Sequence, residues 1–153
     1  DVVMIDDSSF GNNKSQDDSN ETGQLIKLGR SPRSATSKWG GRFPWSASLT
    51  RELRETFGLY EFREQQLEVI NCTMFGHDVF VLMPTGGGKS LCYQLPAVIS
   101  QGITIVVSPL VSLIQDQVMQ LQNLDICTNF LGAGQSEEKE REIYDDIRNP
   151  AGS

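Results

Sequence analysis

The stretch VFVLMPTGGGKSLCYQLP, residues 79–96, places a run of apolar residues directly before three consecutive glycines, a lysine and a serine. Its first five residues have the β-branched and aromatic composition of a strand buried in a parallel sheet, and the pattern from Lys89 onward is typical of a helix. Glycines between a strand and a helix let backbone N–H groups turn toward a ligand, and the start of the helix adds partial positive charge. The stretch therefore predicts a phosphate-binding loop.

The lysine and serine that end this loop extend the prediction to a nucleotide and a metal ion. The ammonium group of Lys89 can reach β- and γ-phosphates, and the hydroxyl of Ser90 can bind Mg²⁺. The usual phosphate-loop pattern, GxxxxGK[ST], asks for glycine at position 83, where this chain has Met83. We nevertheless favour a phosphate-binding loop over a flexible glycine-rich turn beside a surface lysine, because a predicted strand precedes it and a predicted helix follows it.

Strand-like and helical patterns alternate after the loop. Residues 103–108 and 126–132 are predicted strands, the first of them fully buried, and residues 110–124 and 136–148 are predicted helices. Strands that alternate with helices indicate βαβ crossovers. The sequence therefore predicts an α/β fold, a parallel sheet with flanking helices.

Two amphipathic helices are predicted before the loop. In residues 48–58, Leu49, Leu53 and Phe57 recur at four-residue spacing, which places them on one helical face. A second helix is predicted in residues 62–76, where Gly76 would end it. The residues near one face of this second helix are Phe62, Gln66, Leu67, Ile70 and Met74.

The bulk composition limits the classes of protein that need to be considered. A chain of 153 residues fits about one domain, and no apolar run approaches the ~20 residues that span a bilayer, so no membrane role is expected. The net charge of −7 argues against a simple charge-driven nucleic-acid binder, although it leaves room for a local polyanion site. Cys72, Cys92 and Cys127 have neither CxxC spacing nor a nearby histidine, so we expect reduced cysteines of an intracellular protein.

The N-terminal segment differs in composition from the rest of the chain. Residues 1–38 are rich in Ser, Asp, Asn, Gly and Gln, a composition that cannot offset chain entropy by burial, so we predict a disordered tail. Its two aliphatic patches could bind protein partners, although linker sequence is the simpler interpretation. Residues 39–153 are the predicted folded domain. Because the first residue is Asp1, we expect a fragment of a longer protein.

Four blocks of sequence, taken in order, resemble the RecQ family of DNA helicases. The block MPTGGGKSLCYQLP resembles helicase motif I, in which methionine is common at the first position. Residues 57–70, FGLYEFREQQLEVI, resemble motif 0, and residues 106–118, VVSPLVSLIQDQV, resemble motif Ia. The segment FPWS resembles the segment that leads into the helicase domain in several eukaryotic RecQ helicases of the Bloom-like type. The resemblance covers about residues 43–133 and implies part of the first RecA-like domain.

The resemblance implies an ATP and Mg²⁺ site. Gln66 is suited to the N6 and N7 edge of adenine, Arg63 would lie near the base, and Leu59 would face the ring. Without the resemblance, Arg63 and Gln66 would equally fit an exposed polar helix face. Lys89 and Ser90 carry the catalytic roles in this interpretation, with Ser90 as the Mg²⁺ ligand. The implied nucleotide-binding residues are Leu59, Arg63, Gln66, Met83, Pro84, Thr85, Gly86, Gly87, Gly88, Lys89, Ser90 and Leu91.

The resemblance also implies a contact with DNA. In the family the motif Ia segment touches the phosphate backbone of one strand, which points to Ser108, Leu110 and Ser112, supported by Asp116 and Gln117. The alternative for the two serines is that they are ordinary helix caps. The family couples ATP hydrolysis to 3′ to 5′ movement on single-stranded DNA and to duplex unwinding, so a nuclear role in recombination and repair is implied.

Activity of these 153 residues by themselves is not expected. The sequence contains no DEAH-type acidic box and no second RecA-like domain, and phosphoryl transfer depends on the positioning that such groups supply. Two other classes stay open. One is another P-loop nucleotide-binding protein such as a kinase or GTPase, although no guanine-reading NKxD sequence is present. The other is a non-catalytic interaction protein that recruits partners through residues 1–38.

Overall fold

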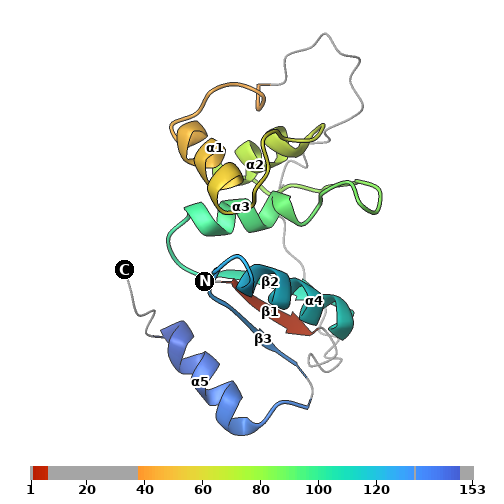
Figure 1. Ribbon diagram of the computed structural model, residues 1–153, viewed down its shortest axis with the longest axis vertical. Helices are drawn as coiled ribbons and strands as arrows, with labels where there is room; N and C mark the ends of the chain where they lie inside the picture. The colour runs from red at the N-terminus through yellow and green to blue at the C-terminus, as the bar shows by residue number, and fades with distance from the viewer. Residues whose placement is uncertain (1, 7–37, 133, 149–153) are drawn as a thin grey trace, which may run out of the picture. The chain divides into compact units, whose positions relative to one another are not determined.

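The computed structural model describes residues 2–6, 38–132 and 134–148, and its contacts divide the chain into two compact units. The helical unit comprises the described residues 38–99. The sheet unit comprises residues 2–6, 100–132 and 134–148. Figure 1 traces both along the chain, and each is described by itself below.

Three helices form the helical unit: α1 (Ser46–Glu55), α2 (Gln66–Met74) and α3 (Leu91–Ile99). The helices predicted before the glycine loop and directly after it are confirmed, with ends that differ by a few residues. The differences are of the size expected where helix ends fray or close with turns. The glycine loop therefore lies between α2 and α3, as the sequence predicts.

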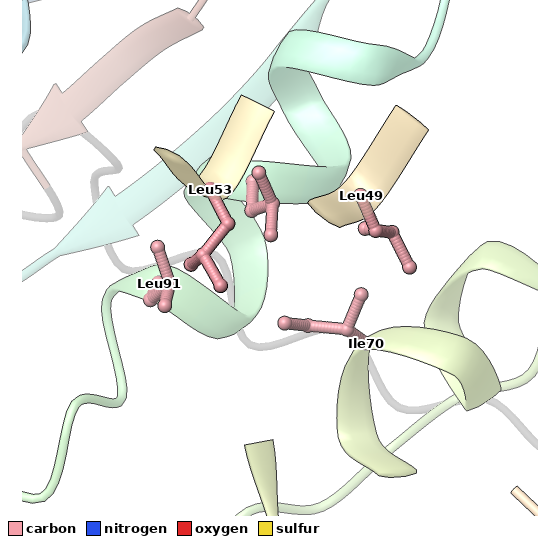
Figure 2. Close-up of a cluster of buried hydrophobic side chains, with 5 residues drawn as sticks. Leu49, Leu53, Ile70 and Leu91 are labelled. Atoms are coloured by element: carbon pink, nitrogen blue, oxygen red, sulfur yellow. The ribbon is translucent and has the colours of Figure 1, made fainter. Parts of the chain in front are cut away.

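A closed apolar core joins these three helices. Leu49 and Leu53 of α1 are 0% and 1% exposed, and they point toward Ile70 of α2 and Leu91 of α3 (Figure 2). Leu95 of α3, also 0% exposed, completes the cluster. Burial of this kind contributes about 1.5–3 kcal/mol for each large aliphatic side chain. The partly buried residues packed around the cluster are Trp45, Phe57, Phe62, Leu67, Met74 and Ile99.

Aromatic rings anchor the segment that leads into α1. Phe43 stacks against Trp39 and Trp45, with ring centroids 6.1 Å and 5.2 Å apart, and all three rings contact Phe75 edge-on. The buried side chain of Asn71 accepts a 2.9 Å hydrogen bond from Trp45 Nε1 and donates a 2.7 Å hydrogen bond to the Trp39 carbonyl. These contacts tie the start of the helical unit to α2.

Three parallel strands and two helices form the sheet unit. The strands are β1 (Val2–Asp6), β2 (Thr104–Ser108) and β3 (Thr128–Leu131), in the order β2-β1-β3 (Figure 1). Val2 pairs with Thr104 on one side and with Thr128 on the other. The helices are α4 (Val111–Gln122) and α5 (Glu137–Arg148). The strands and helices predicted after residue 100 are present, but β2 and β3 each pair in parallel with β1 and not with each other.

One helix covers a face of this sheet. Helix α4 contacts all three strands, and its buried residues Ile114, Val118 and Leu121 are 0%, 8% and 1% exposed. They recur at helical spacing, so a single apolar stripe supplies the contact. Helix α5 contacts β3 and buries Ile143.

The structure corrects three expectations. Residues 2–6, assigned above to a disordered tail, form β1, because four consecutive apolar residues find strand partners on both sides; residue 1 and residues 7–37 lie outside the described residues. Residues 79–83 are not a strand, since a strand exists only with hydrogen-bonded neighbours and they have none in the described sheet. Strand β2 is not fully buried, because Ile105 and Val107 are 58% and 56% exposed.

Candidate functional site

The glycine loop adopts a conformation that only glycine accepts readily. Gly86 and Gly88 have φ angles of 78° and 86°, and a turn is closed by the hydrogen bond from Gly87 N–H to the Pro84 carbonyl at 2.9 Å. A Cβ atom on Gly88 would lie 2.2 Å from Nε2 of Gln66. Position 88 therefore requires glycine, because the Gln66 side chain occupies the space that a Cβ atom would fill.

Two side chains hold this loop, one from the segment just before α2 and one from the first residue of α2. Gln66 accepts a 2.7 Å hydrogen bond from the Arg63 N–H through Oε1 and donates a 3.0 Å hydrogen bond to the Gly88 carbonyl through Nε2. The Arg63 guanidinium donates from Nη1 to the Gly86 carbonyl. Motif 0 and the glycine loop, which were identified as separate blocks of sequence, therefore meet in the helical unit.

The backbone just before Gln66 is unusual. Gln65, the residue that precedes α2, has φ 70° and ψ −14°, in the left-handed region that few residues other than glycine adopt. The next N–H, that of Gln66, donates to the Arg63 carbonyl at 3.1 Å, and the Gln66 side chain is almost fully enclosed, at 2% exposure of the residue. The sequence gives no signal for this conformation. Such outliers persist where the surrounding structure enforces them.

Unpaired backbone donors gather where the loop enters α3. Within the described part of the chain, the N–H groups of residues 88–91 make no hydrogen bond, and the first bond of the helix runs from Cys92 N–H to the Lys89 carbonyl. Four free donors at the start of a helix form a natural anion site. Lys89 belongs to the same segment, and its Nζ donates to the Met83 and Pro84 carbonyls at 2.8 Å and 3.0 Å.

The other residues predicted for the nucleotide site fall into two groups. Leu59 is 43% exposed and Thr85 is exposed, so both side chains are accessible. Leu91 is 7% exposed within the core cluster, which leaves only its backbone N–H available to a ligand. Next to it, burial raises the pKa of the Cys92 thiol to about 11. The surroundings of the loop are therefore apolar on the core side.

The residues predicted to contact DNA lie in the sheet unit. Ser108 ends β2 and is 7% exposed, whereas Leu110 directly precedes α4 and is 59% exposed. Ser112 is exposed in the first turn of α4. Leu110 occupies the N-cap position and no side chain caps the helix, so neither serine is the ordinary N-cap considered above. Of the supporting residues, Asp116 is exposed and Gln117 is buried.

The described residues contain no group of three or more His, Cys, Asp or Glu residues placed to hold a metal ion. His77 instead contacts the rings of Trp39 and Phe75 at centroid distances of 5.2 Å and 5.5 Å. In the same part of the chain, no helix combines the length and the apolar character needed to cross a bilayer.

Comparisons with known proteins match the region that contains this loop. The sequence model of the DEAD/DEAH box helicase family matches residues 63–151, more than half of the chain. ATP-dependent DNA helicase Q1 of Rattus norvegicus is 49% identical over 107 residues, which are 70% of this chain and 17% of that protein. RecQ-like DNA helicase BLM of Xenopus laevis is 51% identical over 105 residues, 69% of this chain and 8% of that protein.

A third relative aligns over nearly the whole chain. ATP-dependent helicase SGS1 of Saccharomyces cerevisiae is 42% identical over 146 residues, 93% of this chain and 10% of that protein. The chain thus spans less than a fifth of the length of each of these three relatives.

Proposed function

This chain belongs to the DEAD/DEAH box helicase family, within its RecQ group, and from that premise we propose that residues 57–91 form the ATP-binding site of a DNA helicase. The observation that carries the proposal is the contact between the start of α2 and the glycine loop. Arg63 and Gln66 reach the carbonyls of Gly86 and Gly88 across more than twenty residues of sequence. A nucleotide that spans both segments would meet base-reading and phosphate-binding groups together.

The phosphate part of the proposed site fits a triphosphate. The free N–H groups of residues 88–91 supply donors, and Lys89 supplies a positive charge already held at the mouth of the loop. Bound Mg²⁺ would neutralise charge on the phosphate oxygens, and the Ser90 hydroxyl would be its protein ligand. The loop residues Met83, Pro84 and Thr85 complete the proposed phosphate site.

The adenine part of the proposed site depends on Gln66. Its amide uses one acceptor position for the Arg63 N–H and one donor hydrogen for the Gly88 carbonyl. One lone pair and one hydrogen remain, and these complement the N6 and N7 edge of adenine. Because Gln66 is 2% exposed, the side chain must turn partly outward to meet a base. The exposed side chain of Leu59 would cover the adenine ring.

DNA is the proposed second ligand. Leu110 and Ser112 present an accessible side chain and hydroxyl beside the N-terminus of α4, where backbone donors suit a phosphate, and Ser108 would contribute through its backbone. We include Asp116 and Gln117 as supporting residues. In a helicase of this family these contacts would couple ATP hydrolysis to 3′ to 5′ movement on DNA and to unwinding, in nuclear recombination and repair. Residues 39–153 would be part of the first RecA-like domain, and residues 7–37 a linker or partner-binding tail.

Nucleotide titration of the 153-residue polypeptide tests the proposal. Isothermal titration calorimetry with ATP and Mg²⁺ should show binding that Lys89→Ala weakens about tenfold or more, since it removes a charged donor. Lys139→Ala, on the exposed surface of α5, is the matched control and should change nothing. Hydrolysis by this polypeptide alone should be negligible for lack of the acidic box. Equal affinity of wild type and Lys89→Ala would overturn the proposed site. Hydrolysis at the rate of an intact helicase, lost on Lys89→Ala, would overturn the expected inactivity.

A further inference from the structure

A basic cavity lies beside α1, separate from the residues of the proposed nucleotide site. Its volume is about 660 Å³, and its lining comes from the segment before α1 and from one face of that helix. Three arginines, Arg42, Arg51 and Arg54, line it together with a single carboxylate, that of Glu55. The chain as a whole is acidic, with a net charge of −7, whereas three guanidinium groups and one carboxylate make the lining of this cavity basic.

The geometry of α1 explains why the arginines face outward together. Leu49 and Leu53 point into the core, so the lining residues of α1 occupy the opposite side of the helix. Arg51 and Arg54 are three residues apart, which makes them neighbours on one face. Arg42 joins them from the segment before the helix. The aromatic contacts of Trp39, Phe43 and Trp45 fix that segment, so the fold sets the position of the backbone at Arg42.

Two of these arginines have no hydrogen-bond or ion-pair partner among the described residues. Arg51 contacts Glu52 at 3.0 Å and Glu55 at 4.0 Å. Within the described residues, neither Arg42 nor Arg54 makes a hydrogen bond, an ion pair or a cation–π contact, and both are exposed. An anionic ligand would give Arg42 and Arg54 the charged partner that the described residues do not supply.

We propose that Arg42, Arg51 and Arg54 bind backbone phosphates of DNA, as a contact additional to the residues around α4; this rests on the proposed DNA-helicase function. Guanidinium groups bind phosphates through paired N–H donors. Recognition here is of phosphates and not of bases, because the ring of Phe43, the aromatic residue of the lining, already stacks against Trp39 and Trp45. The contact would therefore be independent of DNA sequence.

Fluorescence anisotropy with a labelled 20-nucleotide oligo-dT and the 153-residue polypeptide tests the site, without nucleotide and over a series of salt concentrations. The variant is Arg42→Gln/Arg54→Gln. The control is Arg141→Gln/Arg148→Gln, which removes two exposed charges from α5 and changes the net charge equally. We expect the variant to bind about tenfold or more weakly, with a salt slope smaller by about 1.4 for two lost phosphate contacts. The control should stay within about twofold, because its charges act only at long range.

Several results would overturn the site. They are absence of oligo-dT binding by the wild type, equal losses in variant and control, and equal competition by polyglutamate, which would mark a site for acidic protein. Circular dichroism melting checks that the variant is folded, and if it is not, Arg42→Lys/Arg54→Lys should keep the salt slope while the affinity falls. ATP affinity is measured on the same samples. Loss of ATP binding with DNA binding intact would contradict the proposed nucleotide site and not this one.

Discussion

The core of the helical unit and strand β2 of the sheet unit differ in how far their apolar residues are buried. In the helical unit, Leu49, Leu53 and Leu95 are at most 1% exposed and close a core between three helices. In the sheet unit, α4 contacts the three strands, while Ile105 and Val107 of β2 stay more than half exposed. A closed core rigidly supports what is attached to it. The glycine loop and its two braces, Arg63 and Gln66, are attached to the closed core.

Truncation of buried and exposed apolar side chains should give the largest difference in unfolding free energy between the two units. Leu53→Ala should lower the free energy of unfolding of the helical unit by about 2–5 kcal/mol, because it leaves a cavity at a fully buried site. Ile105→Ala, at a residue 58% exposed, should cost less than about 1 kcal/mol. Urea unfolding followed by circular dichroism measures both, and tryptophan fluorescence reports the helical unit alone because Trp39 and Trp45 are the chain's two tryptophans. Equal costs would contradict the difference in burial.

Gly88→Ala should have the second-largest effect, a loss of stability and of ATP affinity at the glycine loop. The substitution forces a side chain into a backbone with φ 86° and places Cβ 2.2 Å from Gln66 Nε2, so we expect a cost of about 1–3 kcal/mol and a comparable loss of ATP affinity. Gly86→Ala is the matched control, since it has φ 78° but nothing within 4 Å of the added Cβ. Calorimetric ATP titration of both variants should show the larger loss for Gly88→Ala. The reverse order would exclude Gln66 as the neighbour that matters.

The cysteines should show a smaller effect that depends on pH. Burial raises the pKa of the Cys92 thiol to about 11, from an ordinary value of 9.0. The folded state therefore holds the thiol proton more tightly than the unfolded state does. The contribution of this proton to the free energy of unfolding is present below pH 9 and is lost as the pH rises toward 11. The difference in unfolding free energy between wild type and Cys92→Ala should narrow between pH 8 and pH ~10.5. A constant difference would contradict the burial of Cys92.

Thiol labelling gives an independent check on the same residues. Exposed Cys127 should react with a disulfide reagent at pH ~8 long before buried Cys72 and Cys92, because the accessible thiolate is the nucleophile. Burial also raises the pKa of the Cys72 thiol. Mass spectrometry of the first labelled species identifies the site, and labelling at Cys92 first would show that the core near the loop opens readily.

The sequence predicts the helices well because their signals are local. The spacing of Leu49 and Leu53 predicts both the existence of α1 and its buried face, and β2 and β3 are predicted by composition. The strand predicted at residues 79–83 fails because strand formation depends on partners elsewhere in the chain. The same limit explains why β1 was missed.

The glycine loop and its neighbours illustrate the same division within the candidate site. The order of the glycines, Lys89 and Ser90 in the sequence is enough to predict a phosphate-binding loop. The hydrogen bond from Gln66 to Gly88 joins residues 22 positions apart, and Gln65, which precedes Gln66, has a left-handed backbone for which the sequence has no signal. The resemblance indicates Gln66 for a role toward adenine, and the structure adds its role as a brace.

Nucleotide selectivity of Gln66 variants tests the central claim most directly. Wild type, Gln66→Ala and Gln66→Glu are titrated with ATP and GTP; Gln122→Ala, which removes a similar amide hydrogen bond to the Thr128 carbonyl, is the control. We predict that the wild type and the control prefer ATP, that Gln66→Ala binds ATP about tenfold more weakly without preference over GTP, and that Gln66→Glu, which keeps the acceptor but loses the donor, also loses the preference. Unchanged preference for ATP in both Gln66 variants would contradict the account.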